Sequence, residues 1–392
     1  MALAEKSPDG GASLYGRSLV AFVLFGVLLL SNIYVVLPNS AALAALYGRS
    51  SDDVQLFNTA FSLGYAVGFL IWGPLSDSLG RIRAIVTGAL LTGAITLALP
   101  FLLDSYPAFA AARVAQGLTA ASFAPSALSW VATNIPEDRR FAATSWITTS
   151  FLLAGVAGQW IGGALGIKGA LFALGGGYIA LGAVIATFPE AAVGARRSFT
   201  DNLRRMPGLI AGPRSAPYFV TTLVALGVFV ALYTSLNIRA VVARDALEQL
   251  RGVAIATMLL SVFVGQRLKL APTKALVPIL LIEAVTLGLH LALPALPVVA
   301  GWAVHFGFVL VLALSFPVIV SCINLSVEPA IRGTAMAAYT FVLFVGVSVS
   351  AWAAARLDFP EVLALYATAL LGCGILSGVV LLRQRSSLAQ SQ

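Results

Sequence analysis

Charged side chains are scarce in this sequence. Asp, Glu, Lys and Arg make up only 10% of its 392 residues, whereas hydrophobic residues make up 59%. A water-soluble domain usually carries about a quarter charged residues, because polar groups must cover its surface. The composition therefore argues against an ordinary soluble protein and indicates a chain that lies in a membrane.

Cysteine and histidine are equally scarce, with two residues of each. Cys322 and Cys373 lie in or at the ends of separate apolar segments, so they provide neither a disulfide framework nor a metal cluster. An enzyme would need a nucleophile, a base and oxyanion-stabilising groups close together, and the apolar segments show no such cluster. We therefore expect no cofactor and no metal, and the sequence argues against an enzyme.

Long uncharged runs dominate the rest of the chain. Most of them exceed the roughly 20 residues that a helix needs to cross about 30 Å of hydrocarbon. They lack the alternation of lipid-facing barrel strands, and backbone groups in lipid must be bonded internally, so they are predicted to be helices. The first run is too long for the core of a signal peptide, and we expect it to be retained. Twelve spans are predicted, near residues 18–38, 54–75, 82–103, 107–132, 141–165, 168–189, 218–241, 250–268, 274–294, 297–323, 333–355 and 362–382.

Basic residues outnumber acidic ones by 24 to 16, which gives a net charge of +8. Most of them fall in the short segments that face the cytoplasm if both termini are cytoplasmic, as the positive-inside rule favours. The positive charge is therefore explained by membrane topology, and we expect the lipid bilayer, and no nucleic acid, as a partner.

The chain divides into two related halves. A basic linker rich in Gly and Pro, residues 191–217, separates a six-helix bundle at 1–190 from a second one at 218–392. A shift of 192 residues aligns the two halves at several positions, namely Gly73 with Gly265, Pro125 with Pro317 and Arg140 with Arg332. We interpret the chain as a duplicated six-helix bundle, an organisation common in transporters that bind solute between their halves.

Two motifs carry a family resemblance. Residues 54–86, VQLFNTAFSLGYAVGFLIWGPLSDSLGRIRAIV, resemble the second span and following loop of the major facilitator superfamily. Residues 113–121, RVAQGLTAA, resemble its fourth-span signature. The resemblance implies the major facilitator fold, with twelve transmembrane helices in two pseudo-symmetric six-helix bundles. It also implies an integral protein of the bacterial inner membrane, active as a monomer.

Within that superfamily the chain resembles the drug:H+ antiporter branch, especially its bicyclomycin-resistance-like members, through SNIYVVLPNSAALA and GPLSD. It departs from the branch at three places. Asn32 stands where an acidic residue is expected, Gln159 replaces a proline in the fifth-span signature, and GQRLKLAPTK, from Gly265, has no acid. The departures leave proton coupling open.

The loop GPLSDSLGRIRA suggests a gate. Gly73 would let a neighbouring helix approach closely, Gly80 would permit the turn, and Asp77 would face the positive end of a helix or an Arg. The resemblance implies that this partner is the start of the eleventh span, which begins with Arg332 and Gly333. Arg81 and Arg83 would hold the loop against lipid phosphates. The alternative is that these charges only set the topology.

Several polar residues within the spans are candidates for a solute or proton path. Arg113 would face the interior, because an Arg in a membrane costs at least ~2.5 kcal/mol, or it would extend to the headgroups. Gln116 lies one turn further on. His305 is equivalent to Arg113 under the 192-residue shift and can change its charge near neutral pH, or it has a structural role.

Glu283 is the one acid deep in a predicted span. Its burial favours the neutral form, which suits either a proton carrier or a packing role. The resemblance places cavity-lining residues in spans 1 and 7, with a further aromatic in span 11. These residues are Asn32, Tyr34, Tyr233, Asn237 and Tyr339.

These features predict a secondary transporter that moves a small organic solute outward in exchange for protons by alternating access. Two alternatives stay open at this point. One is a proton-independent facilitator or uptake carrier, and the other is a membrane protein that binds or senses without transporting.

Overall fold

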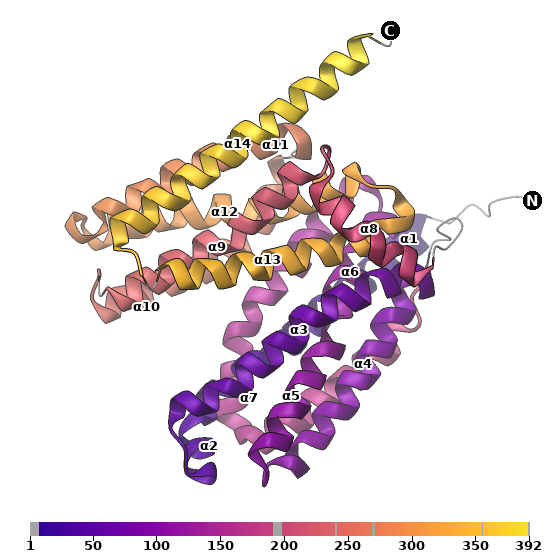
Figure 1. Ribbon diagram of the computed structural model, residues 1–392, viewed down its shortest axis with the longest axis vertical. Coiled ribbons are helices and arrows are strands. Elements are labelled where there is room, and N and C mark those ends of the chain that lie inside the picture. Colours follow the sequence, from indigo (N-terminus) through magenta and orange to yellow (C-terminus); the bar gives the residue numbers. More distant parts are fainter. Residues whose placement is uncertain (1–7, 191–197, 240, 269–270, 355, 391–392) are drawn as a thin grey trace, which may run out of the picture. The chain divides into compact units, whose positions relative to one another are not determined.

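A computed structural model describes residues 8–190, 198–239, 241–268, 271–354 and 356–390 (Figure 1). The described residues form helices joined by short turns, and none of them forms a strand. The predicted all-α class is therefore confirmed. The chain separates into two compact units, each of which is described in turn.

Unit 1 comprises Met1–Leu203 together with Pro329–Ala337. Its helix α3 packs against α5, and α4 packs against α5 and α7, as Figure 1 shows. Short 3₁₀ turns, Leu37–Asn39 and Leu99–Leu102, follow α1 and α4. The helices of this unit are α1 (Pro8–Tyr34), α2 (Ser40–Tyr47), α3 (Ser51–Leu79), α4 (Arg81–Ala98), α5 (Tyr106–Ala120), α6 (Phe123–Asn134) and α7 (Glu137–Ile185).

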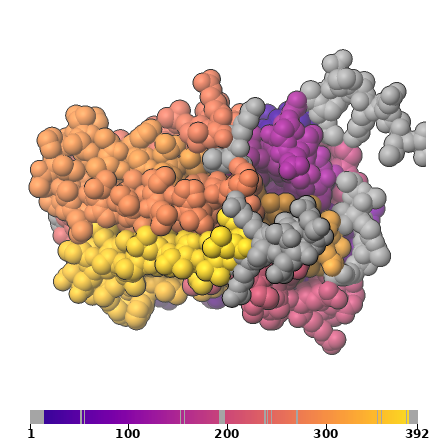
Figure 2. Space-filling model, turned by 90° about the horizontal axis from the view of Figure 1, so that it is seen from above, coloured from indigo at the N-terminus to yellow at the C-terminus, as the bar shows by residue number. Residues whose placement is uncertain are grey.

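Unit 2 comprises Arg204–Glu328 and Ala338–Gln392. In this unit α11 packs against α12 and α14, and α12 also packs against α9 and α10. Figure 2 shows α14, in yellow, alongside the orange α11. Its helices are α9 (Ala216–Ile238), α10 (Arg244–Leu268), α11 (Pro272–Gly288), α12 (Val298–Ser326), α13 (Arg332–Ala354) and α14 (Phe359–Gln390).

Two helices cross the division between the units along the chain. The first six residues of α13 belong to unit 1 and the remainder to unit 2. Helix α8 (Phe199–Ala211) lies inside the predicted linker and is divided after Leu203. Residues 191–197 of the linker lie outside the described residues. The boundaries expected at 190 and 217 stay a prediction.

By length and composition, ten segments of the described chain could cross a membrane. The span predicted at 107–132 is not among them, because the chain breaks at Ala121 and Ser122 into α5 and α6, of 15 and 12 residues. The spans predicted at 141–165 and 168–189 run on as the single 49-residue α7, with a sharp turn at Gly166. The broken span at 107–132 and the joining of the two spans at Gly166 thus account for the difference between these ten segments and the twelve predicted spans.

Local sequence explains where these helices begin and turn. Ser50 and Asp53 form a capping box at the start of α3, in which each side chain accepts the other's backbone N–H. The Ser50 hydroxyl, and after it the Ser50 backbone N–H, donate to the Asp53 carboxylate and hold the pKa of that carboxyl below its usual value. Gly166 and Gly80 have φ of 64° and 110°, a region that glycine adopts without strain.

Large apolar side chains cover much of the outside of both units. Phe101 and Trp160 are 75% and 76% exposed in unit 1, and Ile375 is 68% exposed in unit 2. Exposed apolar surface on this scale is rare in a soluble monomer and is typical of a surface that faces lipid. The chain is a membrane protein, as predicted.

Candidate functional site

The carboxylate of Asp77 binds the first turn of α13. Its Oδ1 accepts a hydrogen bond from the Gly333 N–H at 2.8 Å. Its Oδ2 accepts bonds from the Thr334 N–H at 2.6 Å and from the Thr334 hydroxyl at 2.8 Å. Backbone N–H groups in the first turn of a helix have no partner within that helix, so the carboxylate satisfies two of them and complements the positive helix end.

Two glycines allow this close approach. A Cβ on Gly333 would lie 2.5 Å from the Asp77 Oδ1 and 2.3 Å from the Ser76 Oγ. A Cβ on Gly73 would lie 2.0 Å from the Ala337 Cβ. Any side chain at either position would push α3 and α13 apart. The hydrogen bonds of Asp77 therefore depend on Gly73 as well as on Gly333.

Arg81 completes the Asp77 cluster, which we define as Asp77, Arg81, Gly333 and Thr334. Its Nη2 lies 3.6 Å from the Asp77 Oδ1, and both side chains are almost fully buried. The same nitrogen donates to the Pro329 carbonyl at 2.9 Å, and Nε donates to the Ser129 hydroxyl. Arg81 thus lies inside the unit, and its expected place at lipid phosphates is wrong.

The other two basic residues of the predicted gate lie elsewhere. Arg83 is exposed. Arg332 donates from Nη1 to the Ala132 carbonyl at 3.1 Å, so its side chain points away from Asp77. The partner of Asp77 is therefore the start of α13, through its backbone and Thr334, and not the Arg332 guanidinium.

A second polar network in unit 1 centres on Arg113, which is fully buried in α5. Its five N–H donors meet five neutral acceptors. Two of the bonds are short, to the Gln116 Oε1 at 2.6 Å and to the Asn32 carbonyl at 2.9 Å. The three longer ones, of 3.3 to 3.5 Å, reach the Phe57 carbonyl and the Oδ1 atoms of Asn32 and Asn58. Arg113 thus lies inside the bundle rather than extending to the headgroups.

No carboxylate pairs with Arg113 within the described part of the chain. Burial of an uncompensated charge is costly, and the five bonds offset that cost, helped by the Phe61 ring 4.8 Å from the guanidinium carbon. A fixed positive charge therefore remains in unit 1. An anionic group that bound there would have to replace one of the longer bonds.

The Arg113 network extends through most helices of unit 1. Gln116 donates to the Thr96 hydroxyl of α4 at 2.7 Å. Asn32 donates to the Tyr178 hydroxyl of α7 at 2.6 Å, and Tyr178 donates to the Leu28 carbonyl of α1 at 2.9 Å. A buried network whose members are all bonded fixes one arrangement of the helices.

The remaining candidates in the predicted spans are scattered. Tyr34 is half-buried on α1 and packs on Gly155, where an added Cβ would lie 3.6 Å from the ring. Gln159 is exposed on α7 and donates to the Gly155 carbonyl at 2.8 Å. Tyr339 is buried in α13 of unit 2. Asn237 lies in α9, but its side chain is outside the described residues.

In unit 2 the two histidines form a buried chain of hydrogen bonds with a tyrosine. The Tyr233 hydroxyl lies 2.9 Å from the His305 Nε2, and the His305 Nδ1 lies 3.1 Å from the His290 Nε2. The His290 Nδ1 lies 3.0 Å from the Thr286 carbonyl. Tyr233 and His305 are thus brought together as neighbours.

Glu283 is fully buried in α11. Neither of its carboxyl oxygens has a hydrogen-bond partner among the described residues. Two roles were expected for Glu283, and one of them was a packing role through hydrogen bonds. The described residues provide no partner for such bonds. Buried polar groups without partners are uncommon and need an explanation.

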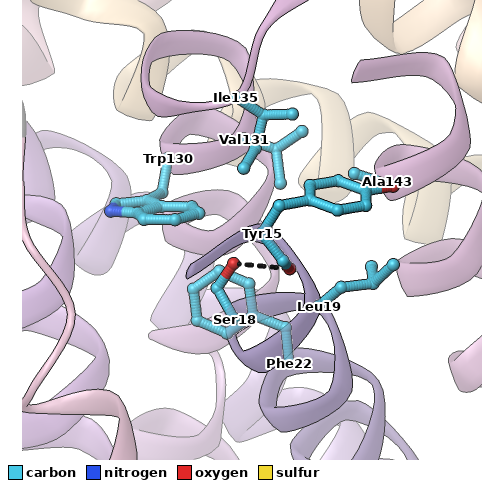
Figure 3. A pocket seen from close by; sticks show the side chains of 8 residues that line it. All are labelled: Tyr15, Ser18, Leu19, Phe22, Trp130, Val131, Ile135 and Ala143. Carbon is cyan, nitrogen blue, oxygen red and sulfur yellow. Dashed lines mark hydrogen bonds between the residues drawn. The ribbon is translucent and has the colours of Figure 1, made fainter. Parts of the chain in front are cut away.

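A small recess near the start of α1 is apolar and contains none of the predicted site residues. Figure 3 shows its lining, where the Ser18 hydroxyl donates to the Tyr15 carbonyl at 3.1 Å and the other side chains are mostly apolar. The lining residues are Tyr15, Ser18, Leu19, Phe22, Trp130, Val131, Ile135 and Ala143. It is not a candidate solute site.

Sequence reasoning missed two residues that complete these clusters, Thr334 and Tyr178, and did not pair His290 with His305. Thr334 directly follows the predicted Gly333 contact, and a Thr at the start of a helix is a recognisable polar signal. His290 is one of only two histidines in the chain. Tyr178 could not have been found, because 146 positions separate it from Asn32.

Comparisons with known proteins identify the fold. A family model described as the Major Facilitator Superfamily matches residues 20–384. The bicyclomycin resistance protein homolog of Haemophilus influenzae is 35% identical over 129 residues, which is 32% of this chain and 32% of that protein. The match thus spans about a third of the relative's length.

Solved structures of transporters share the fold at low identity. The E. coli fucose:proton symporter aligns with a TM-score of 0.71 at 14% identity, over 93% of this chain and 98% of its own. A bacterial homologue of the iron transporter ferroportin, in its outward-facing state, aligns with a TM-score of 0.72 at 16% identity, over 95% and 99%. The predicted arrangement of twelve transmembrane helices in two six-helix bundles is confirmed.

Proposed function

The chain belongs to the major facilitator superfamily of membrane transporters, and we propose that it exports a small organic solute in exchange for protons by alternating access. The relative named for bicyclomycin resistance supports an organic solute and outward transport. The polar groups of the two units are mostly neutral donors and acceptors beside aromatic rings, which suits a polar or amphipathic compound better than a cation.

The observation that carries this function is the Asp77 contact with α13. Three hydrogen bonds join residues 256 and 257 positions apart in the chain, and they meet at one carboxylate. Such a contact is strong while it is dry and is readily replaced by water when the helices separate. We propose that the Asp77 cluster closes the cytoplasmic side during one half of the cycle and breaks in the other.

A proton-independent facilitator or uptake carrier is the second candidate. Asn32 favours it, because an amide stands where the antiporter branch has an acid, and that amide is already bonded to Tyr178 and Arg113. Exchange for protons would then have to use a group elsewhere in the chain. The titratable groups of unit 2 are the place to look.

We further propose a monomer in a bacterial inner membrane. The distribution of Lys and Arg supports a cytoplasmic position for both termini. The two bundles would be the moving parts, with 191–217 as the cytoplasmic connection between them. Alternating access in duplicated bundles is largely a rocking of one bundle against the other.

Reconstitution into liposomes that contain a pH-sensitive dye tests the function. Bicyclomycin is the first solute to add, followed by a panel of neutral, anionic and cationic organic compounds. We expect a solute gradient to move protons in the opposite direction. Solute flux without any pH change would favour the facilitator, and the absence of flux for every compound would contradict transport of this class.

A further inference from the structure

The only two histidines of the chain lie in contact inside unit 2. His290 follows the end of α11 and His305 lies in the first half of α12, and both side chains are fully buried. Their rings meet edge to face at 5.4 Å, and Phe308 covers both. The chain thus brings both of its histidines together in one buried pair of identical titratable groups.

The hydrogen bonds fix which ring nitrogens carry protons. The Thr286 carbonyl can only accept, so the His290 Nδ1 must donate to it. The Nε2 of a neutral His290 is then an acceptor, and the His305 Nδ1 must donate to it. By the same reasoning the Nε2 of His305 accepts from the Tyr233 hydroxyl. All three bonds therefore run in one direction, from Tyr233 to Thr286.

This chain of bonds has one open end. A backbone carbonyl cannot pass on a proton, so nothing leaves at Thr286. At the other end Tyr233 is only partly buried, and a hydroxyl can both accept and donate a proton. A proton that enters must therefore leave by the same route. Alternating access requires this, because a site that faces each side of the membrane in turn is loaded and emptied through one opening.

We propose that His290 and His305 form a single proton-binding site that is loaded and emptied through the Tyr233 hydroxyl. A proton arriving at the Tyr233 oxygen displaces the hydroxyl proton onto the His305 Nε2. The proton on the His305 Nδ1 then moves to the His290 Nε2. Each step exchanges one O–H or N–H bond for another, and the charge arrives at His290.

The pair holds one proton and not two. With both rings charged, the His305 Nδ1–H and the His290 Nε2–H would point at each other across 3.1 Å, and two like charges would lie in contact in a dry environment. A single charge at His290 is favoured, because its Nδ1 bonds a carbonyl in the last turn of α11, where a cation is stabilised by the helix dipole.

Few other charged groups surround the pair. On α10, Glu248 and Arg251 are bonded to each other and are the charges that act on Tyr233. On α11, Glu283 lies seven positions before His290, about 10 Å along the helix. On α14, Glu361 is exposed at the helix start and Tyr366 is bonded to Ser350. No carboxylate among the described residues pairs with either imidazole, so the pair does not carry a permanent charge.

Nuclear magnetic resonance with ¹⁵N-labelled histidine tests the site directly, because the full chain contains only two imidazole rings, with two ring nitrogens each. The protein is purified with a tag free of histidine and placed in nanodiscs. At high pH we expect both rings to carry the proton on Nδ1. As the pH falls, we expect one net proton to be taken up, with His290 charged and His305 switched to the Nε2–H form.

Variants at the open end separate this role from simple packing. Tyr233→Phe removes only a hydroxyl, and we expect the His305 Nε2 signal to shift and proton exchange between the pair and water to slow at least tenfold. Tyr366→Phe makes the same change elsewhere in unit 2 and should leave both signals unchanged. Two separate titrations, an Nε2–H ring at high pH, or no titration while the protein stays folded would overturn the proposal.

The part that the pair plays in transport rests on the proposed function, and the two can fail separately. In the liposome assay, proton movement that persists in the His290→Gln, His305→Gln double variant would remove the pair from coupling and leave proton exchange intact. If the wild type moves solute without protons, exchange is wrong, while the magnetic resonance result still decides whether the site exists.

Discussion

Asp77→Asn is the substitution that separates the charge of the Asp77 cluster from its shape. Asn has the size of Asp but offers one acceptor oxygen and one NH₂ group. If the oxygen takes the place of Oδ2 and accepts the two bonds from Thr334, the NH₂ group faces the Gly333 N–H. Two donors then oppose each other where a 2.8 Å hydrogen bond had been. If the amide is turned the other way, its NH₂ group faces Thr334 and the two bonds from Thr334 are lost instead.

The size of the effect follows from these contacts. A buried donor left without a partner costs about 1–3 kcal/mol, and bonds to a charged acceptor weaken when the acceptor becomes neutral. The interaction of the carboxylate with the helix start contributes roughly 0.3–1 kcal/mol more. We expect the closed contact to lose about 2–4 kcal/mol, which is about a 30-fold to 1000-fold change in its equilibrium with the open state.

Amide hydrogen exchange measures this equilibrium without a solute. The N–H groups of Gly333 and Thr334 lie in the first turn of α13, where no intrahelical carbonyl protects them. Their protection therefore reports on Asp77 alone. In Asp77→Asn we expect deuterium uptake in a peptide covering this turn to accelerate by about 30-fold to 1000-fold. Uptake in the middle of α13 should be unchanged.

Asp53→Asn is the matched control, because it makes the same change at the start of the same helix, α3, in a capping box at the protein surface. It should leave the exchange of Gly333 and Thr334 unaltered. If Asp77→Asn accelerates that exchange less than about threefold, the carboxylate does not hold the helix start, and the reasoning behind the gate is refuted.

Three further substitutions have defined outcomes. Gly80→Ala introduces a Cβ at a φ of 110° and should destabilise the protein by about 1–3 kcal/mol, seen as a lower melting temperature, whereas Gly176→Ala, with open space around it, should not. Arg113→Lys has three donors for five acceptors and should lower both the melting temperature and transport in liposomes; unchanged values would contradict a role for the network. Glu283→Gln keeps the shape of a group without partners among the described residues, so its melting temperature should change by only a few degrees; concentrative transport by this variant would exclude Glu283 as the coupling acid.

The fold was largely predictable, because hydrocarbon thickness and backbone hydrogen bonding leave few options for a chain with so little charge. The break of the fourth span at Ala121 and Ser122 was not predictable. Beyond Arg113 that run carries no charge and only small polar side chains near the break, so hydropathy describes it as one helix. The turn at Gly166 was better marked, since a lysine and several glycines lie beside it.

The candidate site was predictable only where a motif linked distant segments. The resemblance pointed Asp77 towards the eleventh span, but it could not say that Thr334 and two backbone N–H groups, and not the Arg332 side chain, bind the carboxylate. Spacing along one helix linked Arg113 to Gln116. Spacing carries no information on contacts between helices, and so Tyr178 and the contact of His290 with His305 were missed.

In both units a hydrogen bond joins the first and the fourth span of the bundle, but the residues that form it differ. In unit 1 a bond from Arg113 joins the fourth span to the first at Asn32, and in unit 2 a bond from Tyr233 joins the first span of that bundle to its fourth at His305. Duplication explains the shared position, because Arg113 and His305 coincide under the 192-residue shift. The chemistry has diverged, since a guanidinium keeps its charge at every physiological pH and an imidazole does not. Unit 1 therefore holds one constant charge, and the proposed charge of unit 2 depends on proton loading, which is the asymmetry that coupling a solute to protons requires.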